Sequence, residues 1–293
     1  MTDTKQTIGW IGAGKMGLPI CMRLQAAGHV VQVLARTAEA KAKLESAGLI
    51  AKLSITDVCR GANIVFSSIS DDAALQEVVC NADGVADTLV KGSTYIDIST
   101  VSPEVSRHVA QRLQQAGIAY LRSPVSGSTV IAQAGTLTAV VSGSKQAFDD
   151  LAALFAAFAK KVFYVGEGEE ARAMKLVLNS MVAATSALLA EALAFGAKGG
   201  LDIATMLNVV NQSVVASPLI AYKTDMIVSG NYKAAASLAM LNKDLNLLLK
   251  TSVTPLPLNA HILEIYQSAI NDGLGEEDFF VLVREAQSTG GKL

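Results

Sequence analysis

Short apolar runs alternate with helix-like segments through the first half of the chain. The apolar runs predict strands at Thr7–Ile11, Val30–Ala35, Ile64–Ser68, Thr94–Ile98, Ala119–Leu121, Thr138–Ser142 and Val162–Val165. Segments between the earlier runs, such as residues 38–47 and 103–116, have the periodicity of helices. This alternation predicts an α/β fold whose mainly parallel, doubly wound sheet has helices on both faces. The later strands follow one another closely, which favours some antiparallel pairing among them.

After Val165 the pattern changes, and only helices are predicted. Residues 169–199 form one apolar segment without proline, which we expect to be a long helix that leads from one domain into the next. Further helices are predicted at Ile203–Asn211, Leu219–Ser229, Ala235–Thr251, Asn259–Asn271 and Asp278–Gln287. We therefore predict two domains, an α/β domain at residues 1–165 and an all-α domain at residues 166–293.

Composition narrows the class of protein. A chain of 293 residues suits two domains, and 51% hydrophobic with 17% charged residues is typical of a globular protein. The net charge of −2 disfavours a nucleic-acid-binding surface. The three cysteines and three histidines are scattered, which predicts no metal site and no disulfide framework. Together with an N-terminus that lacks the pattern of a signal peptide, this favours a reducing cytoplasm.

The positive mean hydropathy of +0.38 raises the question of a membrane span. The most hydrophobic stretch is Leu176–Ala197. It contains the polar residues Asn179, Ser180, Thr185, Ser186 and Glu191. Because polar groups at the middle of a span are costly in lipid, we interpret this stretch as a buried helix and expect no membrane partner.

A glycine-rich loop follows the first predicted strand and opens a helix. Its glycines, Gly12, Gly14 and Gly17, have the G-x-G-x-x-G spacing of a dinucleotide-binding Rossmann domain. In that motif the first glycine permits a tight turn, the second admits a pyrophosphate, and the third allows close packing of helix and strand. The helix N-terminus also attracts phosphate. The predicted loop contacts are Gly12, Ala13, Gly14, Lys15, Met16 and Gly17.

The end of the second strand indicates which dinucleotide binds. An NAD site needs a carboxylate there to accept the ribose hydroxyls. The strand instead ends with Ala35, Arg36 and Thr37, and a guanidinium with a hydroxyl suits a 2′-phosphate. We therefore predict NADP as the cofactor, with NAD as the alternative. Ser68, at the end of the third predicted strand, is also assigned to the cofactor site.

Four ordered motifs then identify a family. They are Gly12–Gly17 with Arg36-Thr37, Asp97–Pro103, Ser123–Ser128 with Ala134–Thr138, and Gly166-x-Gly168 followed by Lys175 and Asn179. Lys243-Asp244 follows in the helical half. From about residue 7 to residue 282 the chain resembles the β-hydroxyacid dehydrogenases, which include 3-hydroxyisobutyrate dehydrogenase, tartronate semialdehyde reductase and the glyoxylate/succinic semialdehyde reductases.

The resemblance implies a set of site residues. Lys175 is the expected general acid/base for hydride transfer to a carbonyl, and Asn179, at i+4 on the same helix face, is expected beside it and the substrate. Ser126 and the Gly127 backbone are expected to hold the substrate carboxylate. Thr100 is expected at the nicotinamide and substrate, and Lys243 is expected to close over the cofactor.

The chain departs from the family pattern at several positions. Arg122 and Ser123 stand where Asp-Ala is usual, Ser128 where a second glycine is usual, and Leu178 where many members have asparagine. The additional guanidinium of Arg122 either alters substrate choice or is a surface replacement.

We therefore predict hydride transfer between NADP(H) and a small β-hydroxyacid or its semialdehyde, of the 3-hydroxyisobutyrate, tartronate or succinic semialdehyde type. Two alternatives remain. One is imine reduction on the same scaffold, although imine reductases usually replace the lysine. The other is a non-catalytic, dinucleotide-binding scaffold protein. The apolar, alanine-rich helical half further predicts a homodimer or homotetramer.

Overall fold

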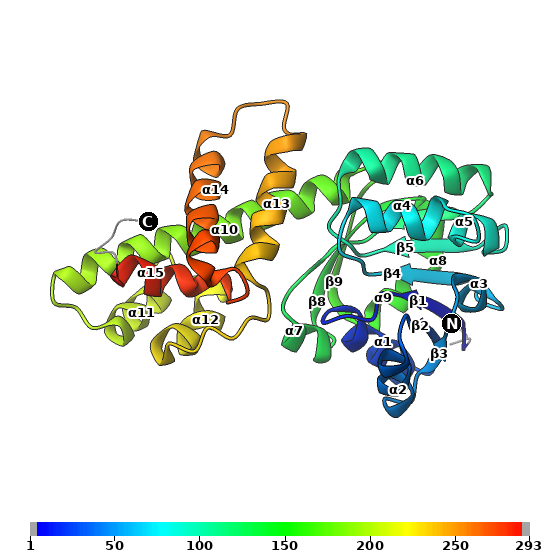
Figure 1. The fold of residues 1–293 in the computed structure, drawn as a ribbon, viewed down its shortest axis with the longest axis horizontal. Coiled ribbons are helices and arrows are strands. Elements are labelled where there is room, and N and C mark those ends of the chain that lie inside the picture. The colour runs from blue at the N-terminus through cyan, green and yellow to red at the C-terminus, as the bar shows by residue number, and fades with distance from the viewer. Residues whose placement is uncertain (1–4, 289–293) are drawn as a thin grey trace. The chain divides into compact units, whose positions relative to one another are not determined.

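The computed structural model describes residues 5–288 of the chain (Figure 1). The chain forms two compact units that divide between Lys175 and Leu176. The first unit contains a sheet and its covering helices, and the second is helical. The α/β class with a mainly parallel sheet, the long helix and the all-helical second part are thus confirmed. The predicted domain boundary after residue 165 stays a prediction.

The strands of the first unit form one sheet. They are β1 Thr7–Ile11, β2 Val30–Leu34, β3 Ile50–Lys52, β4 Ile64–Ser67, β5 Thr94–Asp97, β6 Ala119–Arg122, β7 Val125–Ser126, β8 Leu137–Gly143 and β9 Ala159–Gly166. Their order is β3-β2-β1-β4-β5-β6-β8-β7, and β9 pairs with β8. Strands β1 to β6 pair in parallel, whereas β8 is antiparallel to β6 and β7. The expected antiparallel pairing among the later strands is therefore present.

Helices connect the parallel strands. Those of the first unit are α1 Gly17–Ala26, α2 Ala38–Ser46, α3 Ile55–Cys59, α4 Asp72–Cys80, α5 Val85–Thr88, α6 Pro103–Gln115, α7 Thr129–Gln133, α8 Lys145–Asp150 and α9 Ala152–Ala156. Several begin where a short polar side chain accepts a backbone N–H. Thr37 caps α2, Asp71 caps α4, and Ser102, just before Pro103, caps α6. These residues satisfy N–H groups that a helix start leaves without partners.

The central strands β4 and β5 are buried on both faces because alternate strand residues enter two different hydrophobic clusters. Phe66 on β4 and Ile96 on β5 pack into the cluster that contains α1, α7, α8 and α9. Their neighbours Val65 and Tyr95 pack into the cluster with α3, α4, α5 and α6. Figure 1 shows α4, α5 and α6 side by side along one face. A sheet covered in this way presents its loops, rather than its faces, to ligands.

The second unit consists of helices around a separate core. They are α10 Glu170–Lys198, which begins in the first unit, α11 Ile203–Gln212, α12 Pro218–Ser229, α13 Leu238–Thr251, α14 Pro257–Ala269, the π-turn η1 Ile270–Leu274, the 3₁₀ turn η2 Phe279–Val281 and α15 Leu282–Ser288. Leu207, Leu245 and Phe280 lie in this core. A fully buried pair, Lys223 and Asp278, joins α12 to η2 at 2.5 Å.

Helix α10 has two contrasting sides within the second unit. Alanines such as Ala183, Ala190 and Ala194 face the core. By length and composition α10 is the one helix among residues 5–288 that would be able to cross a membrane, and 39% of its most apolar window is buried in the protein. A core helix of a water-soluble protein has the same length and composition, so the interpretation depends on what covers its outer side.

Candidate active site

The glycine-rich loop after β1 is shaped by close backbone contacts. Gly12 has a φ of +90°, and a Cβ there would lie 2.1 Å from the carbonyl oxygen of Ser68. A Cβ on Gly17 would lie 2.4 Å from the carbonyl oxygen of Gly12. The indole N–H of Trp10 donates to that same carbonyl at 3.2 Å. Gly12 and Gly17 are therefore required by the fold of the loop itself.

Gly14 differs, because a Cβ there would meet nothing within 4 Å. Its open side belongs to a cleft of about 600 Å³. The cleft is lined by Ile11, Gly12, Ala13, Gly14, Leu18, Leu34, Arg36, Thr37, Ala40, Lys43, Leu44, Ile55, Ser68, Ile69, Ser70, Ala74, Glu77 and Val78. At the N-cap of α1, Met16 makes no side-chain capping bond. The Leu18 N–H donates to the Gly14 carbonyl at 3.1 Å and Pro19 has no N–H, so the open space at Gly14 is the feature that fits the pyrophosphate of a dinucleotide.

Two cations line the cleft, one just before α2 and one in its last turn. Arg36 is the one that the sequence indicated, and Lys43 was not predicted. Lys43 follows Ala40 by three residues, so both face the cleft. Helical side chains lean toward the N-terminus, and Ala40 leaves room for the lysine to do so. The Thr37 hydroxyl accepts the Ala40 N–H at 3.1 Å and also hydrogen-bonds the Glu39 carboxylate.

Lys175 lies against the substrate-loop motif. Its ammonium donates to the backbone carbonyl of Val125 at 2.9 Å, next to Ser126 in β7. Lys175, Ser126 and Thr100 are each half-buried, and Gly127 is exposed with a φ of +138°. Within the first unit, the structure thus brings the expected proton donor to the expected carboxylate loop.

Arg122 is buried, with 6% of its surface exposed, so a surface replacement is the wrong interpretation. Its guanidinium pairs with Glu169 at 2.5 Å and lies 4.4 Å above the centre of the Tyr120 ring. Arg122 is buried and the Glu169 side chain is 12% exposed, and their ion pair joins β6 to the residue just before α10. Sequence reasoning missed the partner, which lies 47 positions away.

A second buried guanidinium, Arg172, bonds to Asp97 and to the Tyr120 hydroxyl. Burial raises the pKa of the Tyr95 and Tyr120 hydroxyls, so both stay neutral donors. Burial alone would lower the pKa of Arg172, but Tyr120 and Asp97 raise it overall. This guanidinium therefore keeps its positive charge inside the protein.

In the helical unit, Asn179 and the Lys243-Asp244 motif are neighbours. The Asn179 amide donates to the Asp244 carboxylate at 2.5 Å, and the Lys243 ammonium lies 3.4 Å from the same carboxylate. Asp244 and Asn179 are buried, whereas 40% of the Lys243 side chain is exposed. The Asp244 carboxylate thus orients the side-chain amide of Asn179, with its nitrogen toward α13.

The predicted residues of the glycine-rich loop and of the ends of β2 and β4 divide into two groups. Six line the cleft: Gly12, Ala13, Gly14, Arg36, Thr37 and Ser68. Lys15, Met16 and Gly17 belong to the same turn without lining that cleft. Among residues 5–288, no group of three or more His, Cys, Asp or Glu side chains is arranged to hold a metal ion.

The chain belongs to the β-hydroxyacid dehydrogenase family. Residues 7–166 match the NAD-binding domain of 6-phosphogluconate dehydrogenase. Residues 169–286 match the NAD-binding domain of NADP-dependent 3-hydroxyisobutyrate dehydrogenase. Both matches agree with the motifs and the fold, and they establish an NAD(P)-dependent oxidoreductase family.

Individual relatives cover nearly the whole chain. It is 31% identical to 2-(hydroxymethyl)glutarate dehydrogenase of Eubacterium barkeri over 94% of this chain and 93% of that one. It is 30% identical to the chloroplastic glyoxylate/succinic semialdehyde reductase 2 of Arabidopsis thaliana, over 94% and 78%. The crystal structure of 3-hydroxyisobutyrate dehydrogenase from Salmonella typhimurium, 26% identical, superposes with a TM-score of 0.86 over 96% of this chain and 100% of that one.

One relative bears on the scaffold alternative. The chain is 32% identical to the cytokine-like nuclear factor N-PAC of Xenopus tropicalis over 91% of its own length. It spans about half the length of that relative.

The three glycines predict contrasting effects of adding one methyl group. Gly14→Ala adds a Cβ in open space, so we expect unfolding free energy to change by less than about 0.5 kcal/mol. Dinucleotide affinity should fall at least about tenfold, because that space faces the cleft. Gly12→Ala meets the Ser68 carbonyl and should lower stability by roughly 1–3 kcal/mol. Thermal unfolding measures the stability of both variants, and NADPH titration measures their dinucleotide affinity. Equal destabilisation of the two variants would contradict the assignment of Gly14 to binding and Gly12 to the fold of the loop.

Proposed function

We propose that the protein transfers a hydride between NADP(H) and a small β-hydroxyacid or its semialdehyde, of the 3-hydroxyisobutyrate, tartronate or succinic semialdehyde type. The hydrogen bond from Lys175 to the Val125 carbonyl carries this proposal, since it places an ammonium beside Ser126. The substrates named for the relatives, a hydroxymethyl diacid, a semialdehyde and 3-hydroxyisobutyrate, all bear a carboxylate and a hydroxyl or carbonyl group. That shared chemistry supports the same class here.

The chain's own groups have separate tasks in this reaction. Bound NADPH would supply the hydride to the carbonyl carbon. Lys175 donates the proton that neutralises the developing charge on the carbonyl oxygen, and it removes that proton in the reverse direction. The Ser126 hydroxyl and the Gly127 N–H hold the substrate carboxylate. Thr100 acts at the nicotinamide, and Asn179, one turn beyond Lys175, hydrogen-bonds the reacting substrate.

The cations in the cleft support NADP as the preferred cofactor. Arg36 and Lys43 provide two positive charges to the cleft, and Thr37, at the N-cap of α2, provides a hydroxyl. A phosphate monoester needs such charge-assisted donors, whereas a ribose diol needs a carboxylate acceptor. Glu77 is the one carboxylate among the residues that line the cleft. We assign the 2′-phosphate to Arg36, Thr37 and Lys43.

A non-catalytic scaffold is the second candidate, and the likeness to N-PAC favours it. Imine reduction is disfavoured by Lys175. We also propose a reducing, cytoplasmic location, since Cys21, Cys59 and Cys80 are free thiols. Turnover tests separate the reductase from the scaffold.

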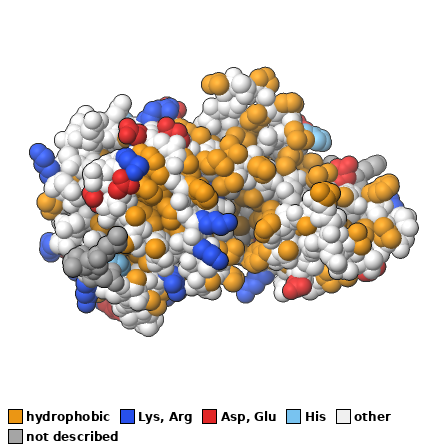
Figure 2. Space-filling model, turned by 180° about the vertical axis from the view of Figure 1, so that it is seen from behind, with side chains coloured by type: hydrophobic (Ala, Val, Ile, Leu, Met, Phe, Trp, Pro, Cys, Tyr) orange, Lys and Arg blue, Asp and Glu red, His pale blue; other side chains and the backbone are white. Residues whose placement is uncertain are grey.

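The outer side of α10 supports a homo-oligomer. Met181, Leu188 and Phe195 follow one another at intervals of seven residues and are 63%, 69% and 82% exposed. Large apolar side chains in such a stripe are typical of a helix that packs against another helix. Figure 2 shows hydrophobic side chains exposed over the helical unit, with few charges among them.

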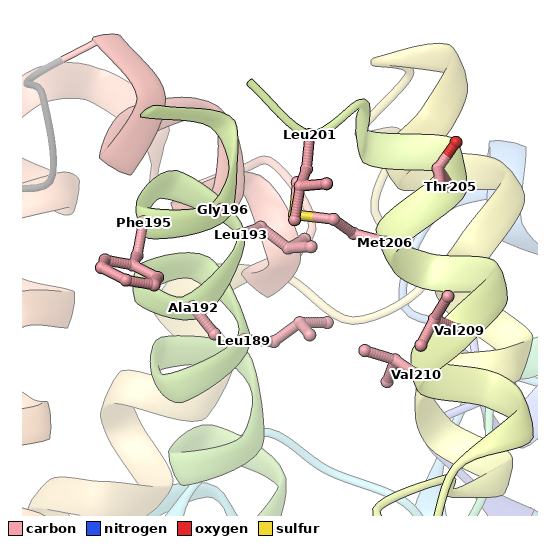
Figure 3. Close-up of a pocket in the computed structure, with 10 residues that line it drawn as sticks. All are labelled: Leu189, Ala192, Leu193, Phe195, Gly196, Leu201, Thr205, Met206, Val209 and Val210. Carbon is pink, nitrogen blue, oxygen red and sulfur yellow. The ribbon is translucent and has the colours of Figure 1, made fainter. Parts of the chain in front are cut away.

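A neighbouring groove continues this apolar surface. It measures about 310 Å³, lies between α10 and α11, and has no charged residue in its lining. Figure 3 shows Leu193, Leu201 and Met206 pointing toward one another in it. We propose that a second copy of the chain covers the stripe and the groove, which gives a homodimer or homotetramer and leaves no apolar side for a membrane.

Removal of the Lys175 amine tests whether the protein is a reductase in which Lys175 is the general acid. NADPH oxidation would be followed by absorbance with glyoxylate and with succinic, methylmalonic and tartronic semialdehydes. We expect Lys175→Ala to retain NADPH affinity and to lose roughly 10²–10⁴-fold in rate, as expected for a missing general acid. Lys161→Ala, on exposed β9, is the control. Tight NADPH binding without turnover of any carbonyl by the unaltered protein would favour the scaffold function.

Loss of the guanidinium at Arg36 tests the cofactor. We expect Arg36→Ala to weaken NADPH binding by roughly 10–150-fold, the value of a charge-assisted bond of about 1.5–3 kcal/mol. NADH binding should change less than about threefold. Lys41→Ala is the matched control, because Lys41 is a nearby cation on α2 that pairs with Glu45 at 2.9 Å and is not among the residues that line the cleft. Fluorescence titration measures both cofactors, and equal losses for NADPH and NADH would refute the 2′-phosphate assignment.

A charge in the middle of the apolar stripe tests the oligomer. We expect Leu188→Glu to convert the protein to a monomer in light scattering, because an unpaired carboxylate is costly to bury at an interface. Leu258→Glu is the control, since Leu258 on α14 is similarly exposed at 67% but lies outside the stripe. An unaltered protein that is monomeric, or that requires detergent or lipid for solubility, would contradict this proposal.

A further inference from the structure

A buried cluster of charges surrounds the start of α10 in the first unit. Asp97, at the end of β5, and Arg172, on α10, are 0% and 1% exposed, and their charged groups lie 2.5 Å apart. Arg122 and Glu169 form the second pair of the cluster. Two guanidiniums thus balance two carboxylates, and loss of one member would leave a buried charge unpaired.

Arg172 uses its planar fork in several directions at once. Besides Asp97, it donates to the backbone carbonyl of Ser99 at 2.6 Å and to the Tyr120 hydroxyl at 2.8 Å. It also donates to the Ser106 hydroxyl at 3.3 Å. Because the guanidinium is planar and bonds four partners, it fixes the orientation of the helix turn that carries it. A lysine or an apolar side chain in its place would not fix that orientation.

Asp97 extends the cluster to the loops that follow β4 and β5. One of its oxygens accepts the hydroxyls of Ser67 and Ser99, each at 2.5 Å. The Ser99 hydroxyl in turn accepts the backbone N–H of Ile69 at 2.9 Å. Ile69 lines the dinucleotide cleft, and Ser99 directly precedes Thr100. The same ion pair therefore connects the loop after β4, which contains Ile69, with the loop after β5, which contains Thr100, and with the first turn of α10.

Lys175 follows Arg172 by three residues, which is about 4.5 Å along the helix axis. Its ammonium reaches the Val125 carbonyl from this turn. We infer that Arg172 is a positioning residue, whose buried ion pair with Asp97 sets the place of Lys175 relative to Thr100. This inference rests on the proposed function of Lys175. It adds a residue that touches neither substrate nor cofactor.

Stability alone is a weaker explanation of the pair. Two charges inside a protein lose their hydration, and a well-packed apolar pair often holds elements together as well. A network of charge-assisted bonds instead defines direction and distance. Proton transfer needs such definition, since a displacement of about 1 Å can cost roughly 10²-fold in rate.

The test is a single-turnover measurement with NADPH and the best aldehyde substrate. The amplitude of the absorbance change reports the fraction of folded enzyme, and the rate constant reports the reaction in each active site. NADPH deuterated at C4 verifies that hydride transfer is observed. We expect Arg172→Met to lower the rate constant roughly 10²-fold and Arg172→Lys to lower it about tenfold, with substrate KM within about threefold.

Two further variants keep the result decisive. Asp97→Asn combined with Arg172→Met leaves no unpaired charge, and it should fold and still show the slow rate constant. Lys223→Met breaks the other fully buried pair, with Asp278 in the helical unit, and should lower the amplitude without changing the rate constant. If the Arg172 variants behave like Lys223→Met, the pair is structural and the inference is wrong.

Amide hydrogen exchange separates this inference from the proposed function. Arg172→Met should speed exchange at residues 173–176 at least about tenfold, and Lys223→Met should not. Unaltered exchange there overturns the positioning role even if Lys175 is catalytic. Faster exchange in a protein that reduces no carbonyl would retain the anchoring and refute the reductase.

Discussion

The ion pair between Arg172 and Asp97 is the interaction on which the geometry of the first unit depends. Asp97 ends a central parallel strand, where ligand-binding loops begin, and Arg172 lies in the first turns of the long helix. Because both charges are shielded from water, each must be satisfied by protein groups. Ser67, Ser99 and Tyr120 supply those groups, and the two serines directly precede the predicted site residues Ser68 and Thr100.

This arrangement gives the loops after β4 and β5 a common support. The cleft for the dinucleotide is open on the Gly14 side but closed where Gly12 meets Ser68. Small residues therefore determine where the backbone leaves room for a ligand, and the buried charges hold the helix turn from which Lys175 reaches the Val125 carbonyl. These two features are independent. The glycines act by having no side chain where the backbone comes close, whereas the buried charges act by providing hydrogen-bond partners for polar groups inside the protein.

The regular part of the fold could be predicted because hydrophobic periodicity is a local signal. Strand β1 was predicted with the bounds that the structure has, and α6 with a difference of one residue. Strands β3 and β7 and the short helices α3 and α5 were not predicted. Elements of two to five residues have too few positions for a period, and packing against the sheet stabilises them instead.

The site was predictable only where a motif names its residues. Gly12, Gly14 and Arg36 have a meaning fixed by their distance from a strand end. Lys43 has such a signal as well, because it lies three residues after Ala40 on a helix that follows Arg36. The partners of Arg122 and Arg172 lie 47 and 75 positions away, and no periodicity connects residues so distant. Tertiary structure alone reveals these pairs.

Helix α10 shows why its sequence resembles a membrane span. Its start carries charges that enter the sheet domain, its middle presents alanines to a helical core, and its outer side carries large apolar residues. Each segment of α10 packs in a different environment. The helix therefore has apolar residues on several sides, and its hydrophobic residues follow no single helical period. Alanine permits close approach of neighbouring helices, whereas Met181, Leu188 and Phe195 leave a large apolar area exposed. Mean hydropathy adds these roles together, and only the side on which each residue lies separates the core, the turn that carries Lys175 and the exposed apolar stripe.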